Sequence, residues 1–113
     1  PELDGLVVKE NYGPLKYLDP IACAQKCINE LQKKKCDLII CISHLGINIE
    51  GISDEEVVAG TRGIDLILGG HSHTFLKKLV YVKDLDGREV GIDQNGKSGI
   101  FVGKMVLDLE KKK

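Results

Sequence analysis

The sequence predicts a mixed α/β (α+β) fold, in which a buried β-sheet is flanked by helices and followed by an antiparallel β-meander. Three observations support this prediction. Two apolar runs without alternation, 38–42 and 64–68, are typical of strands that are covered on both faces. An amphipathic helical pattern precedes the first run, and Asp-Gly and Asn-Gly turns punctuate the β-rich segment after the second.

The bulk properties indicate one small domain of ordinary composition. The chain has 113 residues, of which 42% are hydrophobic and 29% charged, and a formal net charge of -1. Such a balance creates no overall field that would attract nucleic acid or an anionic membrane surface. No apolar run approaches the roughly 20 residues that cross a bilayer. We therefore expect no nucleic-acid partner and no membrane span.

The first element with a clear start is a helix that begins at Asp19-Pro20. Aspartate caps free backbone amides, and the missing N–H of proline costs nothing at the first helical position. Lys33–Lys35 places positive charge at the negative end of the helix dipole. Before this helix, the sequence predicts a short strand at Leu6–Val8 and a turn at Gly13-Pro14.

A second, shorter helix lies between the two apolar runs. Ser53–Glu56 has the pattern of a capping box, which predicts a helix from there to about Thr61, with Gly63 placed to end it.

The second half of the chain is rich in β-formers. Runs at 79–82, 88–93 and 100–109 are separated by turns at 84–87 and 95–97. Asp-Gly and Asn-Gly between such runs are typical of hairpins, so we predict an antiparallel meander of three strands.

Four cysteines, Cys23, Cys27, Cys36 and Cys41, form no Cys-x-x-Cys pair. A zinc ribbon or a thioredoxin motif is therefore not predicted. We interpret these residues as small packing side chains. Metal binding or a disulfide remains an alternative, because Cys23 and Cys27 are neighbours on one helix.

All three histidines of the chain follow the two predicted buried strands. His44 comes after the first strand, and His71 and His73 follow the second, directly after Gly69-Gly70. The carboxyl ends of parallel strands meet at one edge of a sheet, where ligands usually bind. Imidazole binds zinc, manganese or iron, and glycines let the backbone turn beside an ion. A lone His44 would be a hydrogen-bonded histidine, but together the three indicate a metal site.

The acidic residues each have a structural explanation. Helix capping and the helix dipole account for Asp54, Glu55 and Glu56, the start of a strand accounts for Asp65, and turn chemistry accounts for Asp84 and Asp86. The sequence therefore predicts no carboxylate that would bridge two metal ions.

Two motifs at a specific spacing, Ser43-His44-Leu45-Gly46 and Gly63–Thr74, resemble the 5′-nucleotidase branch of the calcineurin-like metallophosphoesterases. The resemblance extends over the whole chain and matches the C-terminal half of the metallophosphatase domain. It implies that residues 1–113 form a single partial domain of a four-layer α-β-β-α fold. It also implies two divalent metal ions, such as zinc or manganese, with His44 and His71 binding one ion and His73 the other.

The activity implied by the resemblance is hydrolysis of nucleotides, as in nucleotide catabolism by 5′-nucleotidases or 2′,3′-cyclic phosphodiesterases, in an exported parent protein that is periplasmic or extracellular. The Asp-x-His, Gly-Asp and Gly-Asn-His motifs of the family do not occur in this sequence. We therefore expect a fragment without a catalytic residue of its own, with weak metal binding, little phosphatase activity and a tendency to self-associate. Two alternatives are a non-catalytic metal-binding or interaction module and a plain α/β domain with hydrogen-bonded histidines.

Overall fold

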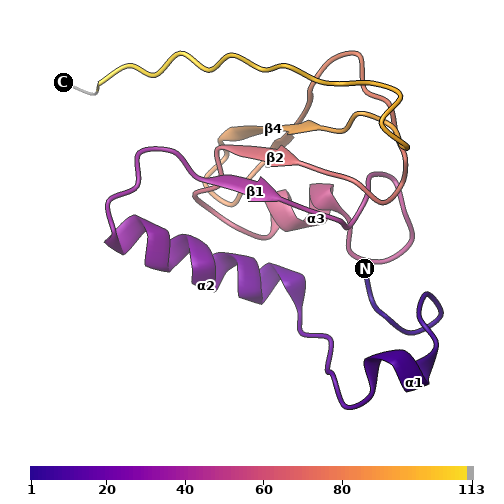
Figure 1. Cartoon of the computed structure of the whole chain (residues 1–113). Helices are drawn as coiled ribbons and strands as arrows, with labels where there is room; N and C mark the ends of the chain where they lie inside the picture. Colours follow the sequence, from indigo (N-terminus) through magenta and orange to yellow (C-terminus); the bar gives the residue numbers. More distant parts are fainter. Residues whose placement is uncertain (112–113) are drawn as a thin grey trace.

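A mixed four-stranded sheet organises residues 1–111, which are the residues that the computed structural model describes; residues 112–113 of the predicted domain lie outside them. Along the sheet the strands are β1 (Ile40–Ile42), β2 (Leu66–Leu68), β4 (Glu89–Asp93) and β3 (Val80–Lys83). β2 pairs in parallel with both β1 and β4, whereas β3 runs antiparallel to β4 (Figure 1). The predicted α/β class is confirmed, and the four-layer arrangement stays a prediction.

Helix α2 (Pro20–Lys33) begins where the sequence predicted. The Asp19 carboxylate accepts hydrogen bonds from the backbone N–H groups of Ile21 and Ala22, at 3.3 and 3.2 Å. Helix α3 (Asp54–Ala59) also lies in its predicted place, but the capping box does not form, because the Ser53 side chain makes no capping hydrogen bond. The helix ends at Gly60, before the predicted Gly63.

Both of these helices cover the same face of the sheet. This helix-covered face carries Cys41, Ile67, Val90 and Ile92, which share it by strand register. Ile67, Val90 and Ile92 are completely buried. The apolar side chains packed with them come from α2, from α3 and from the residues that flank the strands: Ile28, Val57, Val58, Ile39 and Ile64.

The opposite face, which we call the open face, carries Ile40, Ile42, Leu66, Leu68 and Tyr81. The exposed fractions on this face are 85% for Ile42, 41% for Ile40 and 38% for Leu68, whereas Leu66 is buried at 5%. Among the described residues, the prediction of two covered faces is therefore wrong for β1 and for the end of β2, and it holds at Leu66 and Ile67. The physical reason is that α2 and α3 pack on one side of the sheet only.

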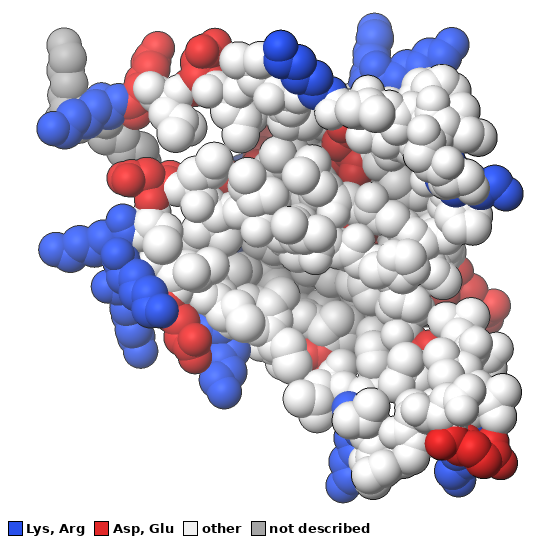
Figure 2. Space-filling view, in the orientation of Figure 1, with Lys and Arg blue, Asp and Glu red and all other residues white. Residues whose placement is uncertain are grey.

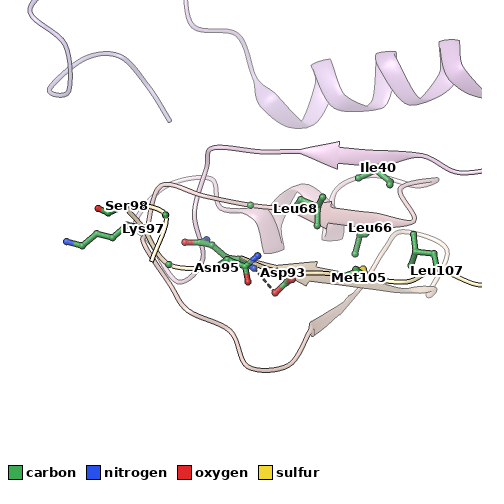
Figure 3. A pocket seen from close by; sticks show the side chains of 14 residues that line it. Ile40, Leu66, Leu68, Asp93, Asn95, Lys97, Ser98, Met105 and Leu107 are labelled. Atoms are coloured by element: carbon green, nitrogen blue, oxygen red, sulfur yellow. Dashed lines mark hydrogen bonds between the residues drawn. The ribbon is translucent and has the colours of Figure 1, made fainter. Parts of the chain in front are cut away.

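A cavity of about 570 Å³ lies against the open face. Ile40, Leu66 and Leu68 line it from the sheet, and Met105 and Leu107 line it from the C-terminal segment (Figure 3). The uncharged middle of the face seen in Figure 2 is surrounded by Lys, Arg, Asp and Glu at its margin.

Strands β1 and β2 occupy only the last three residues of their apolar runs. Asp65 explains the late start. Its carboxylate accepts the N–H of Ile39 at 2.8 Å, and its own N–H donates to the carbonyl of Ile39 at 2.9 Å. A side chain thus replaces the first bond of the strand ladder.

The predicted strand at Leu6–Val8 is wrong. The N–H groups of Leu6 and Val7 both donate to the carbonyl of Leu3, which closes a local turn, and the short helix α1 (Lys9–Tyr12) follows. Backbone groups satisfied locally in this way are not offered to a sheet edge. The turn predicted at Gly13 is present, with a φ of 54° at that residue.

The third strand of the meander, at 100–109, is also absent from the described structure. β3 and β4 form a hairpin, and the chain then leaves the sheet as an irregular extended segment (Figure 1). A third meander strand would have to pair with β4, but β2 and β3 already occupy both of its edges. Val102 is 94% exposed as a result.

The four cysteines are free thiols. Cys41 is half-buried on the helix-covered face, while Cys23, Cys27 and Cys36 are exposed. The interpretation as packing residues therefore holds for Cys41 and is wrong for the other three.

Candidate functional site

Two of the three histidines meet at one edge of the sheet. β1 and β2 are parallel and in register, with Ile42 opposite Leu68, so the loops that follow them leave side by side. The rings of His44 and His71 lie edge to face, with centroids 5.1 Å apart and an interplanar angle of 64°. The shared edge is therefore where the sequence predicted it. The role of these rings as metal ligands stays a prediction.

His73 lies two residues beyond His71 and is exposed. Its ring makes no described aromatic contact like the one between His44 and His71. The structure therefore brings the rings of two of the three predicted ligands, His44 and His71, together.

Burial lowers the pKa of His71, and the positive charges of His44, the N-terminal amine and His73 lower it further, in that order. Positive charges repel one another, so each of these groups disfavours the protonated form of His71. A neutral imidazole is the form that binds a metal ion. The site thus favours the protonation state that a ligand needs.

Glycines let the two histidine loops approach each other. A Cβ placed on Gly70 would lie 3.3 Å from Nδ1 of His44. A Cβ on Gly46 would lie 3.4 Å from Cδ2 of His71 and 3.3 Å from Cβ of Ser72, and Gly46 also has a φ of 98°. Side chains at either position would crowd the space between the imidazoles. Glycine at position 70 therefore leaves room for the ring of His44.

The backbone of the second loop is strained at its histidines. His71 has a φ of 73° and His73 a φ of 57°. Residues other than glycine rarely adopt this left-handed region, although histidine, asparagine and aspartate do so more often than most. Such conformations cost on the order of 1–3 kcal/mol each and persist only where surrounding contacts enforce them.

Asp54 is a site residue that the sequence analysis missed. It is completely buried, and its carboxylate accepts a hydrogen bond from the hydroxyl of Ser43, next to His44. Its other carboxylate oxygen, Oδ2, lies so close to Gly69 that a side chain there would collide with it. Asp54 therefore packs between the two histidine loops.

The environment of Asp54 raises its pKa. Burial raises the pKa of Asp54, and the charge of Glu55 raises it further, while the hydrogen bond from Ser43, the N-terminal amine and His44 act in the opposite direction. Oδ2 has no hydrogen-bond partner among residues 1–111. The position of Asp54 at the start of α3 is the feature of the sequence that could have indicated this contact. Side chains on a helix lean toward its N-terminus, and here that direction leads to the preceding loop.

Gln94, directly after β4, was missed as well. It is 2% exposed, and its side chain hydrogen-bonds to Ser72 and Thr74 in the loop that carries His71 and His73. No local sequence pattern identifies such a contact, because 20 residues separate Gln94 from Thr74.

The donor set fits one side of a metal site. Two imidazoles lie together, and the glycine beside them leaves the space that a Cβ would fill. Within residues 1–111, however, no group of three or more His, Cys, Asp or Glu side chains is placed to hold a metal ion. A complete site would require ligands from outside this set.

Comparisons with known proteins relate the chain to nucleotide phosphoesterases. It is 32% identical over 95 residues to the trifunctional nucleotide phosphoesterase protein YfkN of Bacillus subtilis (strain 168), a match that covers 83% of this chain and 6% of that protein. It is 27% identical over 111 residues to 5′-nucleotidase of Mus musculus (87% and 19%) and 29% identical over 110 residues to snake venom 5′-nucleotidase of Gloydius brevicauda (85% and 18%).

The chain thus spans less than a fifth of the length of each of these curated relatives. No protein-family model matches it. The predicted relationship, which depended on the two histidine motifs, is confirmed by the relatives.

Proposed function

Because the chain is a relative of the 5′-nucleotidase-type nucleotide phosphoesterases, we propose that it supplies part of a dinuclear metal site that hydrolyses nucleotides. One observation carries the proposal. The imidazoles of His44 and His71 lie 5.1 Å apart at the carboxyl ends of two adjacent parallel strands. Such strand ends are the usual ligand-binding edge of an α/β sheet.

In the proposed site, His44 and His71 hold one divalent ion, zinc or manganese, and His73 contributes to a second. Two such ions, when bound, would supply charge stabilisation and a nucleophile for displacement at phosphorus. The part played by this chain is to present the imidazoles of His44 and His71 from two adjacent strand ends. The strained loop and the close-packed glycines support that role.

The chain alone, we propose, binds metal weakly and is inactive. Two imidazoles without a bridging carboxylate leave the charge of a second ion unbalanced. The absence of a three-residue ligand cluster within residues 1–111 supports this part of the proposal. The non-catalytic metal-binding module remains the competing function, because it needs the same histidines.

The proposed substrate is a nucleotide, because the relatives are named as nucleotidases. The proposed location of the whole protein is outside the cell, because one relative is a venom protein. None of the helices in the described part of the chain has the length and apolar character that crossing a membrane requires.

Metal content and hydrolysis, measured together, test the proposal. We would determine Zn²⁺ and Mn²⁺ bound per chain, and assay AMP hydrolysis with added Mn²⁺, for the unaltered chain, His44→Ala and His71→Ala. Cys27→Ala is the control, because exposed thiols also bind zinc. We expect weak binding that both histidine variants abolish and Cys27→Ala preserves, with no hydrolysis above background.

Other results separate the alternatives. Tight stoichiometric zinc without turnover would favour the non-catalytic module. Rapid hydrolysis that His71→Ala abolishes would contradict the inactivity of the chain while supporting the site. Binding unaffected by either histidine variant would refute the site itself.

A further inference from the structure

The side chain of Gln94 reaches from the end of β4 into the loop that carries two of the histidines. Its Oε1 accepts hydrogen bonds from the backbone N–H of Thr74 at 2.6 Å and from the hydroxyl of Ser72 at 3.1 Å. The orientation of the amide follows from chemistry, since an N–H of Thr74 needs an acceptor. Gln94 is only 2% exposed, so water competes little for these hydrogen bonds.

These two bonds alternate with the strained residues. His71 and His73 are the left-handed positions, and Ser72 and Thr74 are the residues that Gln94 holds. Each histidine is therefore followed by an anchored residue. Strain of this kind persists only where other contacts over-determine the backbone, and Gln94 supplies two such contacts from a single oxygen.

The same network extends to the other histidine loop. The Ser72 hydroxyl donates to Gln94, and its oxygen accepts from the backbone N–H of Ile47 at 3.1 Å. Ile47 belongs to the loop that begins with His44. One hydroxyl thus links both loops. It also lies 2.8 Å from Oγ1 of Thr74, so Gln94 provides one of two oxygens that can accept its proton.

Backbone bonds hold the ends of the histidine loop, and one local bond, from the N–H of Ser72 to the carbonyl of Gly70 at 3.0 Å, spans His71. Gly69 N–H donates to the carbonyl of Asp93 at 2.8 Å, and Gly96 N–H donates to the carbonyl of Thr74 at 2.9 Å. Between these points, the side chain of Gln94 is the described contact that reaches the segment from β4. Pairing with the backbone near β4 reaches only the two ends of this segment, so Gln94 is the contact that joins its middle to the sheet.

We propose that Gln94 is a positioning residue, which holds the loop 69–74 in the left-handed conformation that places the ring of His71 against that of His44. Its importance for metal binding rests on the proposed function, but its effect on the loop does not. Residues that orient metal ligands typically change metal affinity by about 10–100-fold when they are replaced.

The test replaces the acceptor and follows the loop without metal. Gln94→Leu keeps the approximate size of the side chain and removes the oxygen. Gln25→Leu is the matched control, because the Gln25 side-chain oxygen also accepts a backbone N–H, that of Arg62 at 2.8 Å, far along the chain from the histidines. Amide hydrogen exchange at Thr74 and φ-sensitive couplings at His71 and His73 would be measured by NMR in the presence of EDTA.

We expect exchange at Thr74 to rise at least about tenfold in Gln94→Leu, as a hydrogen-bonded amide becomes free, and the two couplings to change. Gln25→Leu should change neither. A folded Gln94→Leu chain with a protected Thr74 amide and unchanged couplings would overturn the proposal. If Gln94→Leu does not fold, Gln94→Glu, which retains an acceptor oxygen, decides instead: loss of Thr74 protection in that folded variant would overturn it.

A second readout uses Zn²⁺ alone as the probe. Gln94→Leu should weaken Zn²⁺ binding by at least about tenfold relative to Gln25→Leu. If the unaltered chain binds no Zn²⁺ at the histidines, the proposed function fails, while the exchange result still decides the role of Gln94. If Zn²⁺ binds there equally well to both variants, the loop does not need Gln94 for ligand placement, and the proposal fails while the proposed function stands.

Discussion

The two faces of the sheet differ in how their apolar side chains are used. On the helix-covered face, Ile67 and Ile92 are completely buried against α2 and α3. On the open face, Ile42 in the neighbouring strand is 85% exposed. Residues of the same type therefore contribute very differently, because burial and not composition determines the hydrophobic free energy. The helix-covered face contributes most of the buried apolar area, while the open face leaves Ile40, Ile42 and Leu68 exposed.

The largest effect should come from removing a side chain of the helix-covered face. Ile67→Ala deletes buried methyl groups and leaves a cavity, so we expect the free energy of unfolding to fall by about 2–5 kcal/mol. Ile42→Ala, on the open face, should change it by less than about 0.5 kcal/mol. Urea denaturation followed by circular dichroism measures both. Similar losses for the two variants would mean that the faces do not differ as described.

A second prediction concerns association through the open face. Exposed apolar side chains and unpaired strand edges favour contacts between chains. We expect the unaltered chain to self-associate as its concentration rises in sedimentation velocity, and Ile42→Lys to stay monomeric. Leu85→Lys is the control, because Leu85 is also exposed, at 54%, but lies in the hairpin turn. A chain that remains monomeric throughout would contradict this prediction.

A smaller effect should appear at Asp54, on the helix-covered side. Burial raises its pKa in the folded chain, so the folded state holds this proton more tightly than the unfolded state does. The contribution of Asp54 to stability is therefore present below the unfolded-state pKa, about 4, and is lost as the pH rises through the folded-state pKa. Glu55, His44 and the N-terminal amine are the charges that act on it.

Asp54→Asn removes this dependence. Its stability relative to the unaltered chain should therefore increase as the pH rises from about 4 toward neutrality, where the aspartate would otherwise be buried with a charge. Thermal unfolding across this range, with EDTA present, provides the measurement. Asp37→Asn, at an exposed position, should show no comparable trend. A constant difference between Asp54→Asn and the unaltered chain would contradict the prediction.

Elements with local signals could be predicted from the sequence. The start of α2 depends on Asp19 and Pro20, which act within one turn of the helix. The hairpin of β3 and β4 depends on the turn before Arg88, and the meeting of His44 with His71 depends on the general geometry of parallel strands. In each case the determining contacts lie within a few residues or follow from strand direction.

Features set by distant contacts could not be predicted. The segment 100–109 has the composition of a strand, but it cannot pair with β4, because β2 already pairs with that edge of β4. The local sequence pattern predicts only that Asp54 is an acidic residue at the start of a helix and that Gln94 follows a strand. Their contacts with Ser43 and Thr74 cross 11 and 20 positions of sequence, respectively. The histidines were therefore the part of the site that the sequence could predict, and Asp54 and Gln94 were not.

The left-handed backbone at His71 and His73 also limits which amino acids can stand there. A φ of 73° or 57° is tolerated by glycine, asparagine, aspartate and histidine, and is costly for threonine, valine and isoleucine. Of the tolerated types, histidine and aspartate are common metal ligands. The backbone conformation of the loop therefore restricts which amino acids these two positions accept. An attempt to redesign the metal preference of this edge has few substitutions from which to choose.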